Sequence, residues 1–243
     1  MAERRVLRPR VRRGLIAAGA LALAAGAGYG STYTWLFAAG TVRVEGESRM
    51  TAAEVRRIGG LGVGTNLFHL DASAIEHRLL DDPRVAEASV ETDLPDVVTV
   101  RIVERVPVAR ASVAGAAAIV ADDGELLPGT PSSSLPEIRA VAGVLDRPRR
   151  VAAAGALAEM SPALRRSVVT VFSAADGHLV LETANGVTVT YGAPAETAAK
   201  ATSLRAVLAW ADTQGVDLVA VDVSVPNAPT ARTEDGSVTP TSP

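Results

Sequence analysis

The sequence predicts an α+β protein in which one N-terminal transmembrane helix precedes two folded units. Three observations predict this arrangement. Residues 14–39 contain no charged residue, residues 41–106 have the pattern strand, helix, helix, strand, strand, and residues 107–225 mix short strands with helices. The remaining parts are a basic tail at residues 1–13 and a Pro/Thr/Ser-rich tail at residues 226–243, which we expect to be disordered.

The composition is that of a folded chain without covalent cross-links. Of the 243 residues, 48% are hydrophobic and only 3% aromatic, so the core must consist mainly of aliphatic side chains. The absence of cysteine excludes disulfides, thiolate metal sites and cysteine nucleophiles. The first 13 residues hold six arginines and one glutamate, which leaves 18 basic and 26 acidic side chains for the rest of the chain.

The apolar N-terminal segment has the features of a membrane span. Leu15–Ala39 would form a helix of roughly 37 Å at about 1.5 Å per residue, whereas the hydrocarbon core of a bilayer is about 30 Å thick. Tyr29, Tyr33 and Trp35 lie near its end, where aromatic rings prefer the membrane interface. Because the arginines precede the span, we expect a single-pass protein whose N-terminus is cytoplasmic.

Three other interpretations of this region are weaker. A basic arm could bind nucleic acid, but the apolar run that follows favours a membrane, so we expect no nucleic-acid partner. Ala25-Gly26-Ala27 offers a signal-peptide cleavage site, but the apolar run continues a further dozen residues past it. A buried helix of a soluble core would not need the flanking arginine cluster.

The first folded unit begins with a strand and two helices. Thr41–Glu45 alternates apolar and polar residues, as a half-buried strand does. Thr51 and Glu54 form a capping box, which satisfies the backbone N–H groups at a helix start, and a second box is predicted at Ser73 and Glu76.

Two further strands complete this unit. Arg84–Thr92 is followed by the turn Asp93–Asp96, and the next strand places Val98, Val100 and Ile102 on one face. Period-2 alternation of this kind predicts a sheet with one buried face.

The second unit contains a series of strands and two helices. Asn185-Gly186 predicts a type I′ hairpin, because both central residues of that turn need positive φ. The predicted strands are Val106–Val113, Ala116–Ala121, Leu164–Phe172, the two arms within Leu179–Tyr191, and Leu218–Val225, and the predicted helices are Arg149–Met160 and Pro194–Trp210.

Motifs for catalysis or metal binding are weak. The Gly-x-Gly-x-Gly run at residues 60–64 follows a helix and lacks the Lys-Ser/Thr of a phosphate-binding loop. His69 and His77 are too far apart for the i,i+4 spacing of a zinc helix. His178 has no Gly-x-Ser-x-Gly motif to serve in a catalytic triad. We therefore expect no enzyme activity, no metal and no cofactor.

Several short motifs occur in order over residues 42–109. They are Val42-x-Val44-x-Gly46, Thr51 with Glu54-Val55, Gly64-Thr65-Asn66-Leu67-Phe68, Leu70-Asp71, Pro83-x-Val85, Leu94-Pro95, and Glu104-Arg105-x-Pro107-Val108-Ala109. In this order they resemble the POTRA domain of the FtsQ/DivIB family of cell division proteins, and a looser likeness to the family's β-domain extends the resemblance over most of the chain. One departure is Arg84, where the family often has Trp.

The resemblance implies a scaffold of the divisome. It implies binding to two small membrane proteins, of the FtsB/DivIC and FtsL types, outside the cytoplasmic membrane at the septum, and a role in the control of septal peptidoglycan synthesis. Two alternatives stay open: an outer-membrane assembly or secretion component, since POTRA units also occur there, and a membrane-anchored cell-wall enzyme.

The last predicted strand is the candidate partner-binding site. It would be followed only by a disordered tail, so its backbone N–H and C=O groups could pair with a strand from a partner. The alternative is an ordinary buried edge strand. The candidate residues are Val219, Ala220, Val221, Asp222, Val223, Ser224 and Val225.

Overall fold

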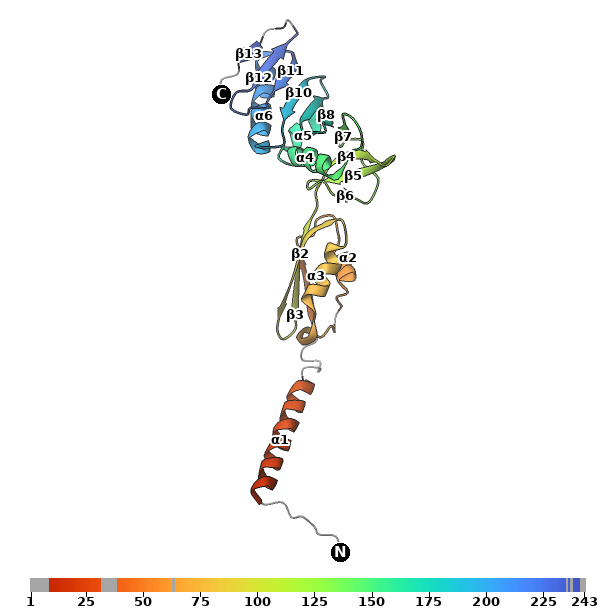
Figure 1. The fold of residues 1–243 in the computed structure, drawn as a ribbon, viewed down its shortest axis with the longest axis vertical. Coiled ribbons are helices and arrows are strands. Elements are labelled where there is room, and N and C mark those ends of the chain that lie inside the picture. The colour runs from red at the N-terminus through yellow and green to blue at the C-terminus, as the bar shows by residue number, and fades with distance from the viewer. Residues whose placement is uncertain (1–8, 32–38, 63, 235, 237, 241–243) are drawn as a thin grey trace. The chain divides into compact units, whose positions relative to one another are not determined.

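The computed structural model describes residues 9–31, 39–62, 64–234, 236 and 238–240. The chain divides into two compact units, Met1–Glu104 and Arg105–Pro243, which are described separately. Figure 1 shows the elements of both units in chain order.

The N-terminal helix α1 spans Pro9–Ser31, so it begins earlier than the predicted span at residues 14–39. Residues 32–38 of that span, and residues 1–8 of the predicted basic tail, lie outside the described residues. Among the helices that the structure describes, none combines the length and the apolar character needed to cross a bilayer. The membrane span therefore stays a prediction.

The first unit contains a three-stranded sheet with helices on one face (Figure 1). The strand order is β1-β3-β2, with β1 parallel and β2 antiparallel to the central β3. The predicted order strand, helix, helix, strand, strand is confirmed. The elements are β1 (Thr41–Glu45), α2 (Ala52–Gly59), the 3-10 turn η2 (Leu67–His69), α3 (Ala72–Leu80), β2 (Val85–Asp93) and β3 (Val97–Glu104).

Local capping explains where the two helices begin. Thr51 and Glu54 form the predicted capping box, and α2 ends at Gly60, whose φ of +69° suits glycine. The second predicted box at Ser73 is wrong: α3 starts after Asp71, whose Oδ1 accepts the Ala74 N–H at 3.0 Å. Asp71 lies earlier in the chain and is itself a strong N-cap residue, so the helix starts there.

The apolar face of β3, which the alternation of residues predicted, lies in the core of this unit. Val98, Val100 and Ile102 are all buried. They lie in one cluster with side chains from both helices, among them Val55, Ile75 and Leu79.

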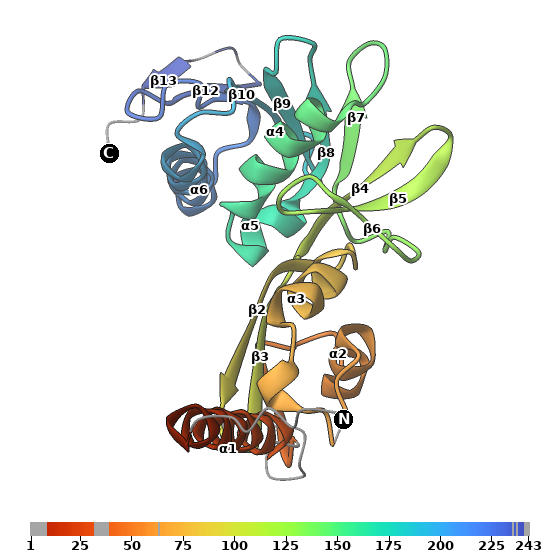
Figure 2. The same ribbon diagram turned by 60° about the horizontal axis from the view of Figure 1, so that its bottom comes forward.

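The second unit is a ten-stranded sheet with the order β13-β12-β11-β10-β9-β8-β7-β4-β5-β6. Helices α4 (Arg147–Ala158), α5 (Pro162–Ser167) and α6 (Thr197–Gln214) lie on the same side of it (Figure 2). The strands are β4 (Pro107–Val113), β5 (Ala116–Ala121), β6 (Leu126–Leu127), β7 (Glu137–Ala140), β8 (Val168–Ser173), β9 (Leu179–Thr183), β10 (Thr188–Gly192), β11 (Leu218–Asp222), β12 (Thr230–Thr233) and β13 (Val238–Pro240).

Two local predictions in this unit are wrong. The segment predicted as a strand from Leu164 begins as helix α5, because Ser161 caps the Leu164 N–H at 3.3 Å and Pro162 occupies the first turn. The hairpin at Asn185-Gly186 has only Gly186 at positive φ, and the Gly186 N–H donates to the Thr183 carbonyl at 2.9 Å. This is a type I turn followed by a glycine, rather than type I′.

A two-residue hairpin turn of type I′ connects β4 and β5. Ala114 has φ +52° and Gly115 has φ +82°, as a type I′ turn requires. Alanine is an unusual choice for the first of these positions, because its Cβ is strained at positive φ.

The prediction of a terminal edge strand followed by a disordered tail is also wrong. Strand β12 pairs antiparallel with β11, and β13 pairs with β12, both within residues 226–243. The Thr-rich composition of β12 is compatible with a strand, and pairing with β11 compensates for its short length. Residues 235, 237 and 241–243 of the predicted tail lie outside the described residues.

Candidate partner-binding surface

Strand β11, the predicted binding strand, has a neighbour on each side. Val221 lies opposite Val189 of the parallel β10 and opposite Ala231 of the antiparallel β12. Beyond the strand, the Val223 N–H donates to the Thr190 carbonyl at 2.9 Å. A partner strand could therefore pair with β11 only after one of these neighbours had left.

The side chains of the predicted segment divide into buried and exposed ones. Val221 and Val223 are buried in the core of the unit. Asp222 accepts the Ser224 N–H at 2.8 Å, which is a local turn contact. Val219 and Val225 are 38% and 58% exposed, so these two apolar side chains remain accessible to a partner.

Contacts with α6 hold the region around β10 and β11 in place. The Tyr191 hydroxyl donates to the Thr197 carbonyl at 2.7 Å, and burial raises the pKa of Tyr191. The Ser203 hydroxyl donates to the Pro226 carbonyl at 2.6 Å and so fixes the chain directly after the predicted segment. The exposed Val225 therefore lies on a well-supported turn rather than on a loose tail.

The sole lysine of the chain, Lys200, belongs to the same support. It is only 2% exposed, its Nζ donates to the Ala193 carbonyl at 2.6 Å, and the Tyr191 ring centroid lies 5.5 Å away. A carbonyl and an aromatic face are both favourable neighbours of an ammonium group.

The residues at the end of the sheet were missed by sequence reasoning. Ala231 of β12 is buried, whereas Thr230 and Arg232 are exposed, which is the alternation of a half-buried strand. The only sequence signal was this short alternation, followed by Gly236, whose φ is +81° and whose N–H donates to the Thr233 carbonyl at 3.1 Å.

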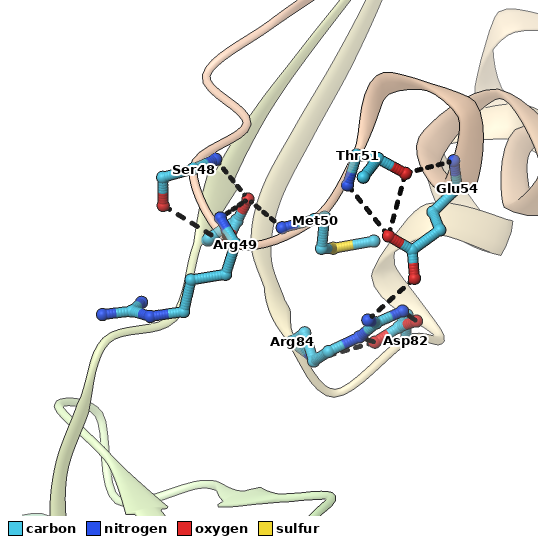
Figure 3. A network of polar contacts seen from close by, with 8 residues as sticks. Ser48, Arg49, Met50, Thr51, Glu54, Asp82 and Arg84 are labelled. Carbon is cyan, nitrogen blue, oxygen red and sulfur yellow. Dashed lines mark hydrogen bonds and ion pairs between the residues drawn. The ribbon is translucent and has the colours of Figure 1, made fainter.

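In the first unit, three consecutive backbone N–H groups bind one carboxylate (Figure 3). The Glu104 carboxylate accepts the N–H groups of Ser48 at 2.6 Å, Arg49 at 3.0 Å and Met50 at 3.0 Å. Burial raises the pKa of Glu104, but these donors outweigh it, so its pKa lies below the ordinary value. Glu104 thereby joins the end of β3 to the start of α2.

Arg84 lies close to that network (Figure 3). It forms ion pairs with Asp82 at 2.8 Å and with Glu54 at 3.5 Å. The hydrogen bond from Arg84 lowers the pKa of Asp82. Arg84 therefore connects the capping box of α2 to the start of β2.

The described residues contain few features of a catalytic or metal-binding site. His178 contacts Asp176, with 3.0 Å between Nδ1 and Oδ2, but both side chains are exposed in a turn. Within the described ranges, no group of three or more His, Asp or Glu side chains is placed to hold a metal ion.

Known proteins similar to this chain were found by sequence. A family model described as POTRA domain, FtsQ-type, matches residues 37–105. The cell division protein FtsQ of Mycobacteroides abscessus is 30% identical over 213 residues, which cover 86% of this chain and 66% of that protein. FtsQ of Streptomyces bingchenggensis is 29% identical over 244 residues, which cover 94% of this chain and 89% of that protein.

Among solved structures, one similar chain is the major extracytoplasmic domain of the cell division protein DivIB from Geobacillus stearothermophilus. It is 20% identical, has a TM-score of 0.35, and the match covers 45% of this chain and 96% of that one.

Proposed function

This chain belongs to the FtsQ/DivIB family of cell division proteins, and we propose that it acts as a scaffold that binds other division proteins outside the cytoplasmic membrane. Its partners in this proposal are proteins of the FtsB/DivIC and FtsL types, and the complex helps to control septal peptidoglycan synthesis.

The observation that carries the proposal is that two apolar side chains of the candidate segment are accessible near one end of the large sheet. Val219 and Val225 expose aliphatic side chains there, on the segment already selected from the sequence as Val219–Val225. Burying such aliphatic side chains against a partner is favourable, because it removes apolar area from water. Rigid support by α6, through Ser203 and Pro226, reduces the entropy lost when a partner binds.

The proposed location is the cytoplasmic membrane at the division septum, with both folded units outside. Support comes from the uncharged run at residues 14–39 and from the arginines that precede it, which favour a cytoplasmic N-terminus. In this division of the chain, residues 41–106 form the POTRA domain and residues 107–225 the β-domain. Labelling of single cysteines placed at Ser112 and Ala2, in a chain that has no other cysteine, tests the orientation. A reagent that cannot cross the membrane should reach only Ser112→Cys in intact cells.

We propose no catalytic role. Support comes from the weak motifs and from the exposed position of the His178–Asp176 pair, which lacks the desolvated setting that shifts catalytic groups.

Co-purification tests the scaffold role. The tagged full chain, extracted from membranes of its own organism with a mild detergent, should carry the FtsB/DivIC-type and FtsL-type proteins with it. The test variant is Val225→Asp, which should recover less of both proteins, and the matched control is Val144→Asp, which changes an exposed valine elsewhere in the same unit. Recovery of neither protein by the wild-type chain would show that the partner proposal is wrong.

A further inference from the structure

We propose that β13 occupies, in the free protein, the sheet edge to which an extended strand of the partner adds, so that the partner must displace β13 to bind. This inference rests on the proposed scaffold role and concerns how access to its binding surface is regulated.

The sheet order identifies the edge. Strand β12 pairs with β11 on one side and with β13 on the other, and β13 is the outermost strand that the structure describes at this end. When β13 leaves, β12 becomes the edge, and its backbone N–H and C=O groups become available to another strand.

Strand β13 is a poor occupant of this position. It has three residues, whose register pairs Val238 with Arg232, Thr239 with Ala231 and Pro240 with Thr230. Pro240 has no backbone N–H, so it cannot donate to this ladder. A longer strand without proline would make more hydrogen bonds with β12 than β13 does.

Strand β12, in contrast, is firmly attached to the unit. Ala231 is buried in the same cluster as Val221 of β11. The register between β11 and β12 runs from Leu218 opposite Thr233 to Asp222 opposite Thr230. Displacement should therefore stop at β13 and leave β12 in place as the acceptor.

The side chains at this end indicate the chemistry of the incoming strand. Arg232 is exposed, lies opposite the uncharged Val238, and takes part in none of the ion pairs found among the described residues. A partner strand with an acidic residue opposite Arg232 would add a cross-strand ion pair that β13 does not provide. The partner segment is thus an extended strand of at least about four residues, free of proline and with one acidic side chain.

A disulfide that joins β12 to β13 and can be reduced again tests the inference. The chain has no native cysteine, so no other disulfide can form. The variant Thr230→Cys/Pro240→Cys places one cysteine on each strand at residues that face each other in the register. The full chain is reconstituted in lipid nanodiscs, and its affinity for the extracytoplasmic part of the FtsB/DivIC-type protein of the same organism is measured with the disulfide formed and reduced. Thr230→Cys alone is the control for the substitution and for the oxidant.

A second variant removes the occupant. A chain that ends at Gly236 lacks β13 but keeps β12 and the turn that follows it. We expect this chain to bind about tenfold more tightly than the full chain, because no strand has to be displaced first. We expect the oxidised double-cysteine variant to lose binding and to recover it on reduction.

The outcomes separate this inference from the scaffold proposal. Equal affinity of the full, locked and shortened chains would show that β13 does not compete, while the scaffold role would stand. Weaker binding by the shortened chain would show that β13 is part of the binding surface and would also overturn the inference. Failure of both the full and the shortened chain to bind would overturn the inference and the partner assignment together.

Discussion

The carboxylate of Glu104 accepts the backbone N–H of Met50 at 3.0 Å, although the two residues are 54 positions apart in the chain. Through this bond and those from Ser48 and Arg49, the last residue of β3 fixes the loop that leads into α2. Hydrogen bonds of backbone N–H groups to a charged acceptor are about twice as strong as neutral ones, so this contact should matter for the stability of the first unit.

Glu104→Gln removes the charge but keeps one acceptor oxygen. We expect the free energy of unfolding of the first unit to fall by about 1–3 kcal/mol, because charge-assisted hydrogen bonds are lost. Urea unfolding followed by circular dichroism measures the change. Glu87→Gln is the matched control, since Glu87 is exposed on β2, and we expect it to have little effect.

The stability difference between wild type and Glu104→Gln should depend on pH. The pKa of Glu104 is lowered in the folded state, so its contribution is fully present above the unfolded pKa of about 4.3 and is lost as pH falls through the folded pKa. The two proteins should therefore differ most near neutral pH and converge in acid. A difference that stayed constant from pH 7 to pH 3 would contradict this role of the charge.

Ala114→Gly should stabilise the second unit. The φ of +52° at Ala114 strains an L-residue but not glycine, and the relief should exceed the added entropy of the unfolded chain by about 0.5–1 kcal/mol. Ala117→Gly, in the adjacent strand at ordinary φ, is the control and should destabilise the unit by about 0.5–1 kcal/mol. Thermal unfolding of the two variants should therefore shift in opposite directions, and a shift in the same direction would show that the turn is unstrained.

Lys200 should resist modification in the folded protein. Because it is buried and is the only lysine, an amine-reactive reagent should label only the N-terminal amine under native conditions. Mass spectrometry should detect Lys200 modification only after denaturant opens the unit, at a rate at least about a hundredfold higher. Native labelling of Lys200 as fast as the N-terminal amine would show that its ammonium group is not buried against Tyr191 and the Ala193 carbonyl.

The features that were best predicted from the sequence are those set by residues close together in the chain. The capping box at Thr51 and Glu54, the alternation at Val98, Val100 and Ile102, and the order of elements in the first unit follow from local pattern, and all are found. The helix at Ser161-Pro162 carried an equally local signal, which the apolar residues after Leu164 obscured.

The position of the candidate binding strand in the sheet was harder to predict from the sequence. Whether a strand lies at an edge depends on residues elsewhere in the chain that pair with it. Val219–Val225 has the alternation of a strand, but nothing within it tells that β12 will cover its outer side. The composition of residues 226–243 favours disorder, and only pairing with β11 explains a strand at Thr230–Thr233. Within the candidate segment Val219 and Val225 are exposed, and the binding role of the segment stays a prediction.

Affinity of the full chain in nanodiscs for the FtsB/DivIC-type protein, compared between wild type and Val225→Asp, tests the scaffold role most directly. A carboxylate at this exposed apolar position should weaken binding by about ten- to a hundredfold, because the charge would be desolvated at the interface, while Val144→Asp should leave the affinity unchanged. Circular dichroism must first show that both variants keep the wild-type fold. Equal affinity of wild type and Val225→Asp would place the partner elsewhere on the molecule, and no measurable binding by the wild type would contradict the scaffold role itself.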